Sequence, residues 1–226
     1  MLNFTPFKGV LFDLDGTLID TIGDITYAIN SALVLTGADP ITPQVCQQFV
    51  GRGLKNALRL ALESSGKAVE EPQLNHLVEL VIETYAVSPY DHSHPYPGIE
   101  ALLTDLHKAG ISLGVLSNKT DSLVQPIIRG LLGHHPFIFI RGAAKEYTSK
   151  PSPEGVYAFG EQLGCSVNQL LLVGDSEVDY YTAEAAKMRS AIVTWGFRTR
   201  ETLLAAGCSS LYDTVGELRK GVFPWL

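Results

Sequence analysis

Residues 9–18 of this 226-residue chain are Gly9-Val10-Leu11-Phe12-Asp13-Leu14-Asp15-Gly16-Thr17-Leu18. The first four form a short apolar run, which predicts a buried β-strand. The run ends at Asp13, and the Asp15-Gly16 pair that follows is typical of a turn. Two carboxylates therefore come directly after the end of a strand. In open α/β sheets, this is the edge at which ligands bind.

Four further apolar runs have the length of strands: residues 111–116, 137–140, 170–173 and 191–194. Segments with helical periodicity separate several of them. One helix is expected to end near Gly110, because glycine favours the turn after a helix. Another, after Thr120, is expected to kink or end at Pro126. This alternation of strands and helices predicts an α/β protein with a Rossmann-like parallel sheet as its core.

The segment between the first two strands differs from the rest of the chain. Residues 22–33, 54–62 and 74–85 carry apolar side chains at helical spacing, and no buried strand interrupts them. Thr42-Pro43 is typical of a helix start. An insertion of roughly 75 residues is too long for a crossover helix. We therefore expect an inserted all-helical cap domain at 20–96 and a catalytic core formed by 1–19 and 97–226. The hinges would lie near residues 18–21 and 95–98.

The composition and charge of the chain exclude several classes of protein. Hydrophobic residues make up 46% and charged residues 18%, which excludes a disordered chain. The net charge of -7 gives no general attraction for nucleic acid or anionic lipid. No apolar stretch is long enough to span a membrane, and the N-terminus lacks the pattern of a signal peptide. Three cysteines at long spacings suggest no disulfide framework. We expect a cytoplasmic protein that is a monomer or a homodimer.

The strand ends carry a distinctive set of polar side chains. Ser117 and Asn118 end the second strand, Asp175 follows the fourth, and Asp179 lies one helical turn later. Lys150 lies in the loop after the third strand. Gathered at one edge with Asp13 and Asp15, these carboxylates need a hard divalent cation, and oxygen ligands favour Mg²⁺. A cation, a lysine and a hydroxyl that converge in this way form a site for a phosphate group.

These residues resemble the motifs of the haloacid dehalogenase-like superfamily, in particular its phosphatases. The four matching motifs, which occur in the family's order, are Phe12-Asp13-Leu14-Asp15-Gly16-Thr17-Leu18, Leu116-Ser117-Asn118-Lys119, Lys150-Pro151-Ser152-Pro153 and Gly174-Asp175-Ser176-Glu177-Val178-Asp179. The helical insertion looks like the family's small cap. Gly51-Arg52-Gly53 and Thr194-Trp195-Gly196-Phe197 look most like the phosphoglycolate phosphatase subgroup. Lys187 departs from the pattern, because relatives often have glycine there, and we expect a local change of turn.

The resemblance implies a role for each of these residues. Asp13 would be the nucleophile that forms an aspartyl-phosphate, and Asp15 the general acid and base. Ser117 and the backbone near Asn118 would hold phosphoryl oxygens. Lys150 would offset the charge that gathers on nucleophile and phosphate. Thr17, Gly51 and Arg52 would add substrate contacts, with Arg52 near a carboxylate or second anion.

The resemblance also implies Mg²⁺ as the cofactor. The Asp13 and Asp175 carboxylates and the backbone carbonyl of Asp15 would bind it. Asp179 would either act as a further ligand or hold a water molecule or Lys150. The substrate would be a small phosphorylated metabolite such as 2-phosphoglycolate. The acidic residue at position 15 favours rapid release of phosphate to water, since cation pumps of the superfamily have threonine there and keep a long-lived aspartyl-phosphate.

Several alternatives stay open. A β-phosphoglucomutase-like enzyme would return the phosphoryl group to a sugar. A non-hydrolytic phospho-switch would keep a stable aspartyl-phosphate, and a binding protein would show no turnover. The Gly51-Arg52-Gly53 segment could equally be a flexible connection between helices. We interpret His92-x-His94 and His134-His135 as solvated loop residues.

Overall fold

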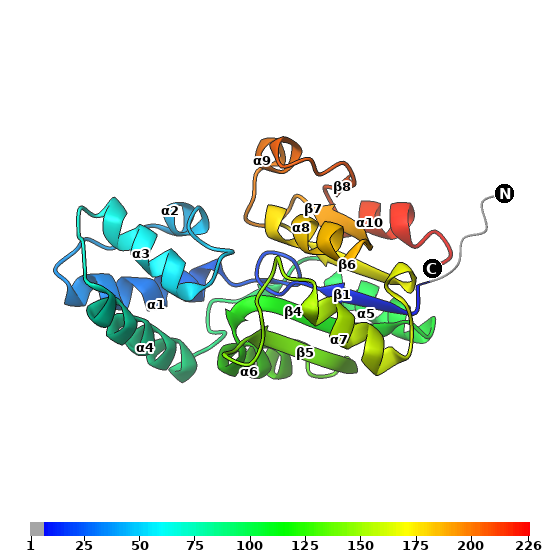
Figure 1. The fold of residues 1–226 in the computed structure, drawn as a ribbon, viewed down its shortest axis with the longest axis horizontal. Coiled ribbons are helices and arrows are strands. Elements are labelled where there is room, and N and C mark those ends of the chain that lie inside the picture. Colours follow the sequence, from blue (N-terminus) through cyan, green and yellow to red (C-terminus); the bar gives the residue numbers. More distant parts are fainter. Residues whose placement is uncertain (1–6) are drawn as a thin grey trace.

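A computed structural model describes residues 7–226, and its centre is a six-stranded sheet in the order β5-β4-β1-β6-β7-β8 (Figure 1). Every neighbouring pair in this sheet is parallel. The strands are β1 (Gly9–Phe12), β4 (Ser112–Thr120), β5 (Phe137–Ala143), β6 (Leu170–Gly174), β7 (Arg189–Val193) and β8 (Leu211–Tyr212). The predicted parallel α/β sheet is therefore confirmed, with β1 at its centre.

Helices cover both faces of the sheet. They are α5 (Ile99–Lys108), α6 (Asp121–Leu132), α7 (Glu154–Leu163), the short 3₁₀ helix η1 (Val167–Gln169), α8 (Glu177–Ala186), α9 (Arg200–Ala205) and α10 (Val215–Val222). Side chains of β1 alternate between the two faces. Val10 and Phe12 share a core with α5, α6 and α10, whereas Leu11 packs with α7 and α8. A strand buried on both faces has the continuous apolar sequence of residues 9–12.

The expected all-helical cap is present between β1 and β4. It consists of α1 (Ile22–Leu35), α2 (Pro43–Gln47), α3 (Leu54–Ser64) and α4 (Glu71–Val87). Figure 1 places this bundle beside the edge where β1 ends. At its base, β2 (Ile19–Asp20) and β3 (His94–Pro95) form an antiparallel pair. This pair joins the chain where it enters and leaves the insertion, and it supports the domain boundaries that we propose near residues 20 and 96.

The structure corrects several details of the prediction. Strand β4 does not end at Ser117-Asn118 but continues to Thr120, with an irregular register against β5 between Leu116 and Thr120. Helix α6 does not end at Pro126 and continues to Leu132. Gly110, with φ of 78°, does follow the end of α5 as expected. The two-residue strand β8 is too short to give a periodic signal. No helix among residues 7–226 has the length and apolar character that crossing a lipid bilayer requires.

Lys187 ends α8 in the left-handed conformation, with φ of 55° and ψ of 42°. Lysine here adopts the backbone geometry that glycine favours. Its amide donates to the carbonyl of Glu184 at 3.0 Å. A side chain in this conformation costs about 1 kcal/mol or more, because its Cβ approaches the backbone closely.

We expect Lys187→Gly to stabilise the fold by about 0.5–1 kcal/mol, since it removes this steric cost. Urea unfolding of the variant and the parent chain measures the difference. Lys187→Ala is the matched control, because it removes the ammonium group but keeps the Cβ. An equal gain from both variants would show that charge, and not backbone geometry, is responsible.

Candidate active site

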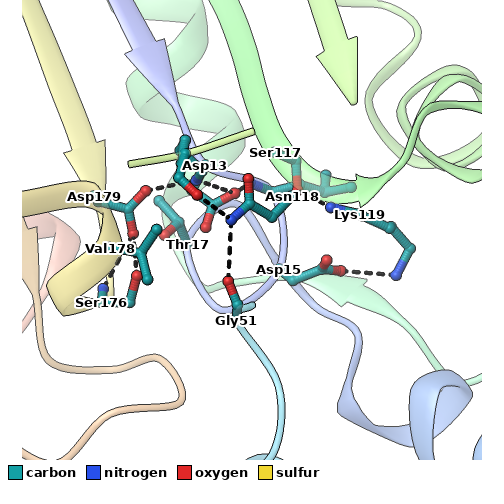
Figure 2. A network of polar contacts seen from close by, with 12 residues as sticks. Asp13, Asp15, Thr17, Gly51, Ser117, Asn118, Lys119, Ser176, Val178 and Asp179 are labelled. Atoms are coloured by element: carbon teal, nitrogen blue, oxygen red, sulfur yellow. Dashed lines mark hydrogen bonds and ion pairs between the residues drawn. The ribbon is translucent and has the colours of Figure 1, made fainter. Parts of the chain in front are cut away.

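Three adjacent strands bring the predicted side chains together at one edge of the sheet (Figure 2). Asp13 directly follows β1, Asp175 directly follows β6, and Ser117 lies in the last part of β4. Together with Asp15 and Asn118, they line a cavity of about 50 Å³ between the sheet and the cap. Its cap side is mainly apolar and includes Ile25, Val50, Leu54, Ala57 and Tyr85.

Lys150 links two of the carboxylates. Its Nζ lies 2.9 Å from Asp13 Oδ1 and 2.6 Å from Asp179 Oδ1, and all three side chains are buried. Burial raises the pKa of Asp13 to about 7, although the Lys150 ammonium opposes the shift. Burial alone would lower the pKa of Lys150, but the two carboxylates outweigh it and raise that pKa. Lys150 therefore stays cationic beside the carboxylate that it contacts.

Asp179 is held rigidly in the first turn of α8. Its Oδ2 accepts hydrogen bonds from Ser176 Oγ at 2.6 Å and from the Ser176 amide at 3.2 Å, which forms a capping box. The other carboxylate oxygen faces Lys150. Asp179 is fully buried, and it fixes the position of the Lys150 ammonium relative to Asp13.

Asp175 lies in a tight backbone cradle. Its Oδ2 accepts a 2.6 Å hydrogen bond from the Phe197 amide, and Thr17 Oγ1 lies 3.5 Å from its Oδ1. A Cβ at Gly16 or Gly196 would lie 2.3 or 2.4 Å from Asp175 Oδ2, so only glycine fits at either position. Burial, followed by the neighbouring charge of Asp13, raises the pKa of Asp175 well above its ordinary value.

These carboxylates fit a divalent metal ion. Oxygens of Asp13, Asp175 and Asp179 all lie within 4.8 Å of one another. Among the contacts described above, Lys150 provides the one positive charge beside these three carboxylates. An all-oxygen set with excess negative charge suits a hard divalent cation. The Asp15 side chain does not belong to this cluster, so a ligand from this residue would have to be its backbone carbonyl.

Asp15 instead points toward a separate group of residues. Its Oδ1 lies 3.0 Å from Lys119 Nζ and accepts a 2.6 Å hydrogen bond from Thr21 Oγ1. Lys119 Nζ also donates to Tyr85 Oη of α4 at 2.8 Å. Lys119, Thr21 and Tyr85 were not assigned roles from the sequence. The position of Lys119 directly after Ser117-Asn118 was the one sequence feature that could have suggested a role. Its contacts could not be predicted, because Asp15 and Tyr85 are distant in the sequence.

Ser117 and Asn118 lie beside Asp13 at the mouth of this site. Ser117 Oγ accepts a hydrogen bond from the Lys119 amide at 3.2 Å. Asn118 Nδ2 donates to the carbonyls of Gly51 and Lys150, at 3.3 and 3.0 Å. Within residues 7–226, the buried Asn118 Oδ1 has no hydrogen-bond partner. This oxygen is available to accept a hydrogen bond from a bound molecule.

Of the other residues predicted to contact the substrate, only some lie at the cavity. Gly51 lines the cavity, whereas the side chain of Arg52 is 66% exposed and pairs with Glu177 outside it. Thr17 is buried behind Asp175 and does not line the cavity. The arginine that does line it is Arg198, which the sequence did not single out. Its guanidinium contacts Glu177 and the carbonyl of Val50, and so connects the core to the cap.

The comparisons with known proteins agree with this geometry. The family model described as "Haloacid dehalogenase-like hydrolase" matches residues 10–193. The chain belongs to the haloacid dehalogenase-like hydrolases. It is 31% identical over 215 residues to a phosphoglycolate phosphatase of Rhodospirillum rubrum, covering 93% of this chain and 89% of the relative. It is 35% identical to one of Cereibacter sphaeroides, covering 84% and 86%.

The similarity to a solved structure extends over the whole fold. The crystal structure of a predicted phosphoglycolate phosphatase from Haemophilus somnus superposes with a TM-score of 0.87 at 27% identity, covering 96% of this chain and 98% of that one. The similarity includes both the sheet and the inserted cap, because nearly all of each chain is covered. This haloacid dehalogenase-like hydrolase is therefore similar throughout its length to proteins of the phosphoglycolate phosphatase group.

Proposed function

We propose that the chain is a Mg²⁺-dependent phosphatase that hydrolyses a small phosphorylated metabolite, such as 2-phosphoglycolate, through an aspartyl-phosphate on Asp13. The arrangement around Asp13 carries the proposal. Its carboxylate lies beside the Lys150 ammonium, within the Asp13–Asp175–Asp179 cluster, in a cavity that Ser117 and Asp15 also line. The relatives named phosphoglycolate phosphatase support the same activity.

In this proposal, one Asp13 oxygen attacks phosphorus in line with the leaving oxygen. The P–O bond to the substrate breaks and an acyl phosphate forms on Asp13. Lys150 offsets the negative charge that accumulates there, and Asp179 keeps its ammonium in place. Ser117 Oγ and backbone amides near Asn118 hold phosphoryl oxygens. Mg²⁺, held by Asp13, Asp175 and the Asp15 carbonyl, would neutralise charge shared by nucleophile and phosphate.

Asp15 would act in both half-reactions. It first donates a proton to the departing alkoxide oxygen, and its carboxylate then takes a proton from the water that attacks the acyl phosphate. Phosphate is released and Asp13 is regenerated. Thr21 and Lys119 hold the Asp15 side chain, and Tyr85 connects this group to the cap. The apolar cap wall would exclude other water molecules.

We also propose that the enzyme is cytoplasmic. Cys46, Cys165 and Cys208 are all free thiols in the structure. Free thiols suit a reducing compartment and support the expectation of a cytoplasmic enzyme.

A panel of phosphomonoesters tests this function. We expect phosphate release with Mg²⁺ and none after chelation, with the highest kcat/KM for small acids such as 2-phosphoglycolate. β-Glucose 1-phosphate should give no glucose 6-phosphate. Conversion of the sugar phosphate without net phosphate release would support the phosphotransferase. A stable phosphoprotein without turnover would support the phospho-switch, and binding without any reaction would support a binding protein.

Stability of the metal-free protein should fall as the pH rises. Burial raises the pKa of Asp13 from 3.8 to about 7, so the folded chain holds a proton that the unfolded chain has released. The favourable contribution of this proton is present at acidic pH and is lost as the pH rises through about 4 to 7. Asp175 shifts in the same direction.

Bound Mg²⁺ should reverse this trend, because it replaces the protons on the carboxylates. Thermal unfolding with a chelator and with excess Mg²⁺, at about pH 5 and about pH 8, measures both effects. We expect the increase in Tm caused by Mg²⁺ to be larger at the higher pH. An increase that is the same at both would contradict metal binding at Asp13 and Asp175.

A further inference from the structure

A second cluster of metal-ligating side chains joins α5 to the turn between α6 and β5. Glu100, in the first turn of α5, and the adjacent His134 and His135 each place a ligand atom within 4.8 Å of the others. His134 Nε2 lies 3.4 Å from Glu100 Oε2. The centroids of the two imidazole rings are 4.1 Å apart, and their planes are tilted by 43°. None of the three residues lines the active-site cavity.

His135 provides an independent indication that a ligand binds here. This residue is only 8% exposed, and its Nε2 is buried without a hydrogen-bond partner among residues 7–226. A buried polar atom without a partner destabilises the folded chain. Burial also lowers the pKa of His135, so its imidazole is neutral and keeps a lone pair. A metal ion would use that lone pair, for which the described residues provide no hydrogen-bond donor.

The distance between His134 and Glu100 agrees with a transition metal. A tetrahedral zinc ion with bonds of about 2.0–2.1 Å separates neighbouring ligand atoms by about 3.3 Å. The observed 3.4 Å between His134 Nε2 and Glu100 Oε2 is close to this value. Two imidazoles and one carboxylate match the ligand preference of Zn²⁺ and differ from the all-oxygen set around Asp13.

We propose that Glu100, His134 and His135 form a second metal site, which binds Zn²⁺ or a similar transition metal independently of the active site. His135 forms the buried base of this site. His134 and Glu100, whose side chains are 59% and 56% exposed, form its open side and give the ion access from solvent. A bound ion would connect α5 to the turn before β5. The site would therefore stabilise the core without taking part in catalysis.

Zinc binding in the presence of excess Mg²⁺ tests this proposal, because under the proposed function Mg²⁺ competes with Zn²⁺ for the active-site carboxylates. Calorimetric titration of the full chain with Zn²⁺ should show one site. We expect at least tenfold weaker binding in His135→Ala and in His134→Ala. Zn²⁺ should raise the Tm of the parent chain but not that of His134→Ala/Glu100→Gln. Both of those positions are exposed, so this double variant should fold normally. Phosphate release with Mg²⁺ alone should be unchanged in these variants.

His76→Ala is the matched control, because His76 is an exposed histidine on α4. It should bind Zn²⁺ as the parent chain does. The proposal is wrong if the parent chain binds no Zn²⁺ beside Mg²⁺. It is also wrong if His134→Ala/Glu100→Gln and His135→Ala keep the full affinity, since cysteine thiols or active-site carboxylates would then be the ligands.

Discussion

Asp15→Asn is expected to lower the steady-state rate of phosphate release by about 10²–10⁴, because the amide can neither donate nor take up the proton. The cluster of Asp13, Asp175 and Asp179 does not include the Asp15 side chain, so Mg²⁺ binding should change little. The two half-reactions can be separated with p-nitrophenyl phosphate, whose leaving group needs no proton. We expect the variant to release about one nitrophenolate per enzyme and then to slow sharply, because the acyl phosphate persists.

Asp20→Asn is the control for this experiment. Asp20 lies in the same connecting segment, and its Oδ1 accepts a hydrogen bond from the Ile22 amide, which asparagine can also provide. This variant should keep normal turnover. Steady turnover of p-nitrophenyl phosphate by Asp15→Asn, without a burst, would contradict the assignment of Asp15 to the second half-reaction.

Lys150→Met should both destabilise the protein and abolish most of its activity. The substitution removes the ammonium that lies between Asp13 and Asp179, and it leaves two carboxylates buried without their partner. Breaking a buried ion pair from one side costs about 3–5 kcal/mol. Urea unfolding without metal measures this loss. Phosphate release should fall as well, because nothing replaces the charge beside the transferred group.

Two comparisons make the Lys150 result specific. Lys145→Met, at an exposed position of the same loop, should change neither stability nor turnover. Added Mg²⁺ should restore part of the stability of Lys150→Met but little of its activity, since a metal ion can neutralise the carboxylates without reproducing the ammonium. If Lys150→Met were as stable as the parent chain, the proposed charge balance around Asp13 would be wrong.

The sequence was most informative where a short local pattern determines the structure. The apolar run at 9–12 predicted β1 with the bounds that are observed, because a strand buried on both faces needs apolar side chains at every position. Asp13, Ser117 and Asp175 could be placed at one edge, since parallel strands end on the same side. The insertion could be identified as helical from its periodicity alone.

Contacts between distant segments could not be predicted in this way. The pairing of Lys119 with Asp15 joins residues 104 positions apart, and that of Lys119 with Tyr85 depends on how α4 packs on the core. The resemblance implied a substrate contact for Arg52, but its side chain lies toward Glu177, outside the cavity. Arg198 faces the cavity because the loop after β7 turns toward the cap, and no local pattern specifies this turn.

The proposed mechanism depends on Asp13 as the nucleophile of a metal-dependent phosphatase. Phosphate release from 2-phosphoglycolate by the parent chain and by Asp13→Asn, each with and without Mg²⁺, tests it most directly. We expect turnover only for the parent chain with Mg²⁺, and none for Asp13→Asn under either condition. Normal turnover by Asp13→Asn, or turnover by the parent chain without any divalent metal, would contradict it.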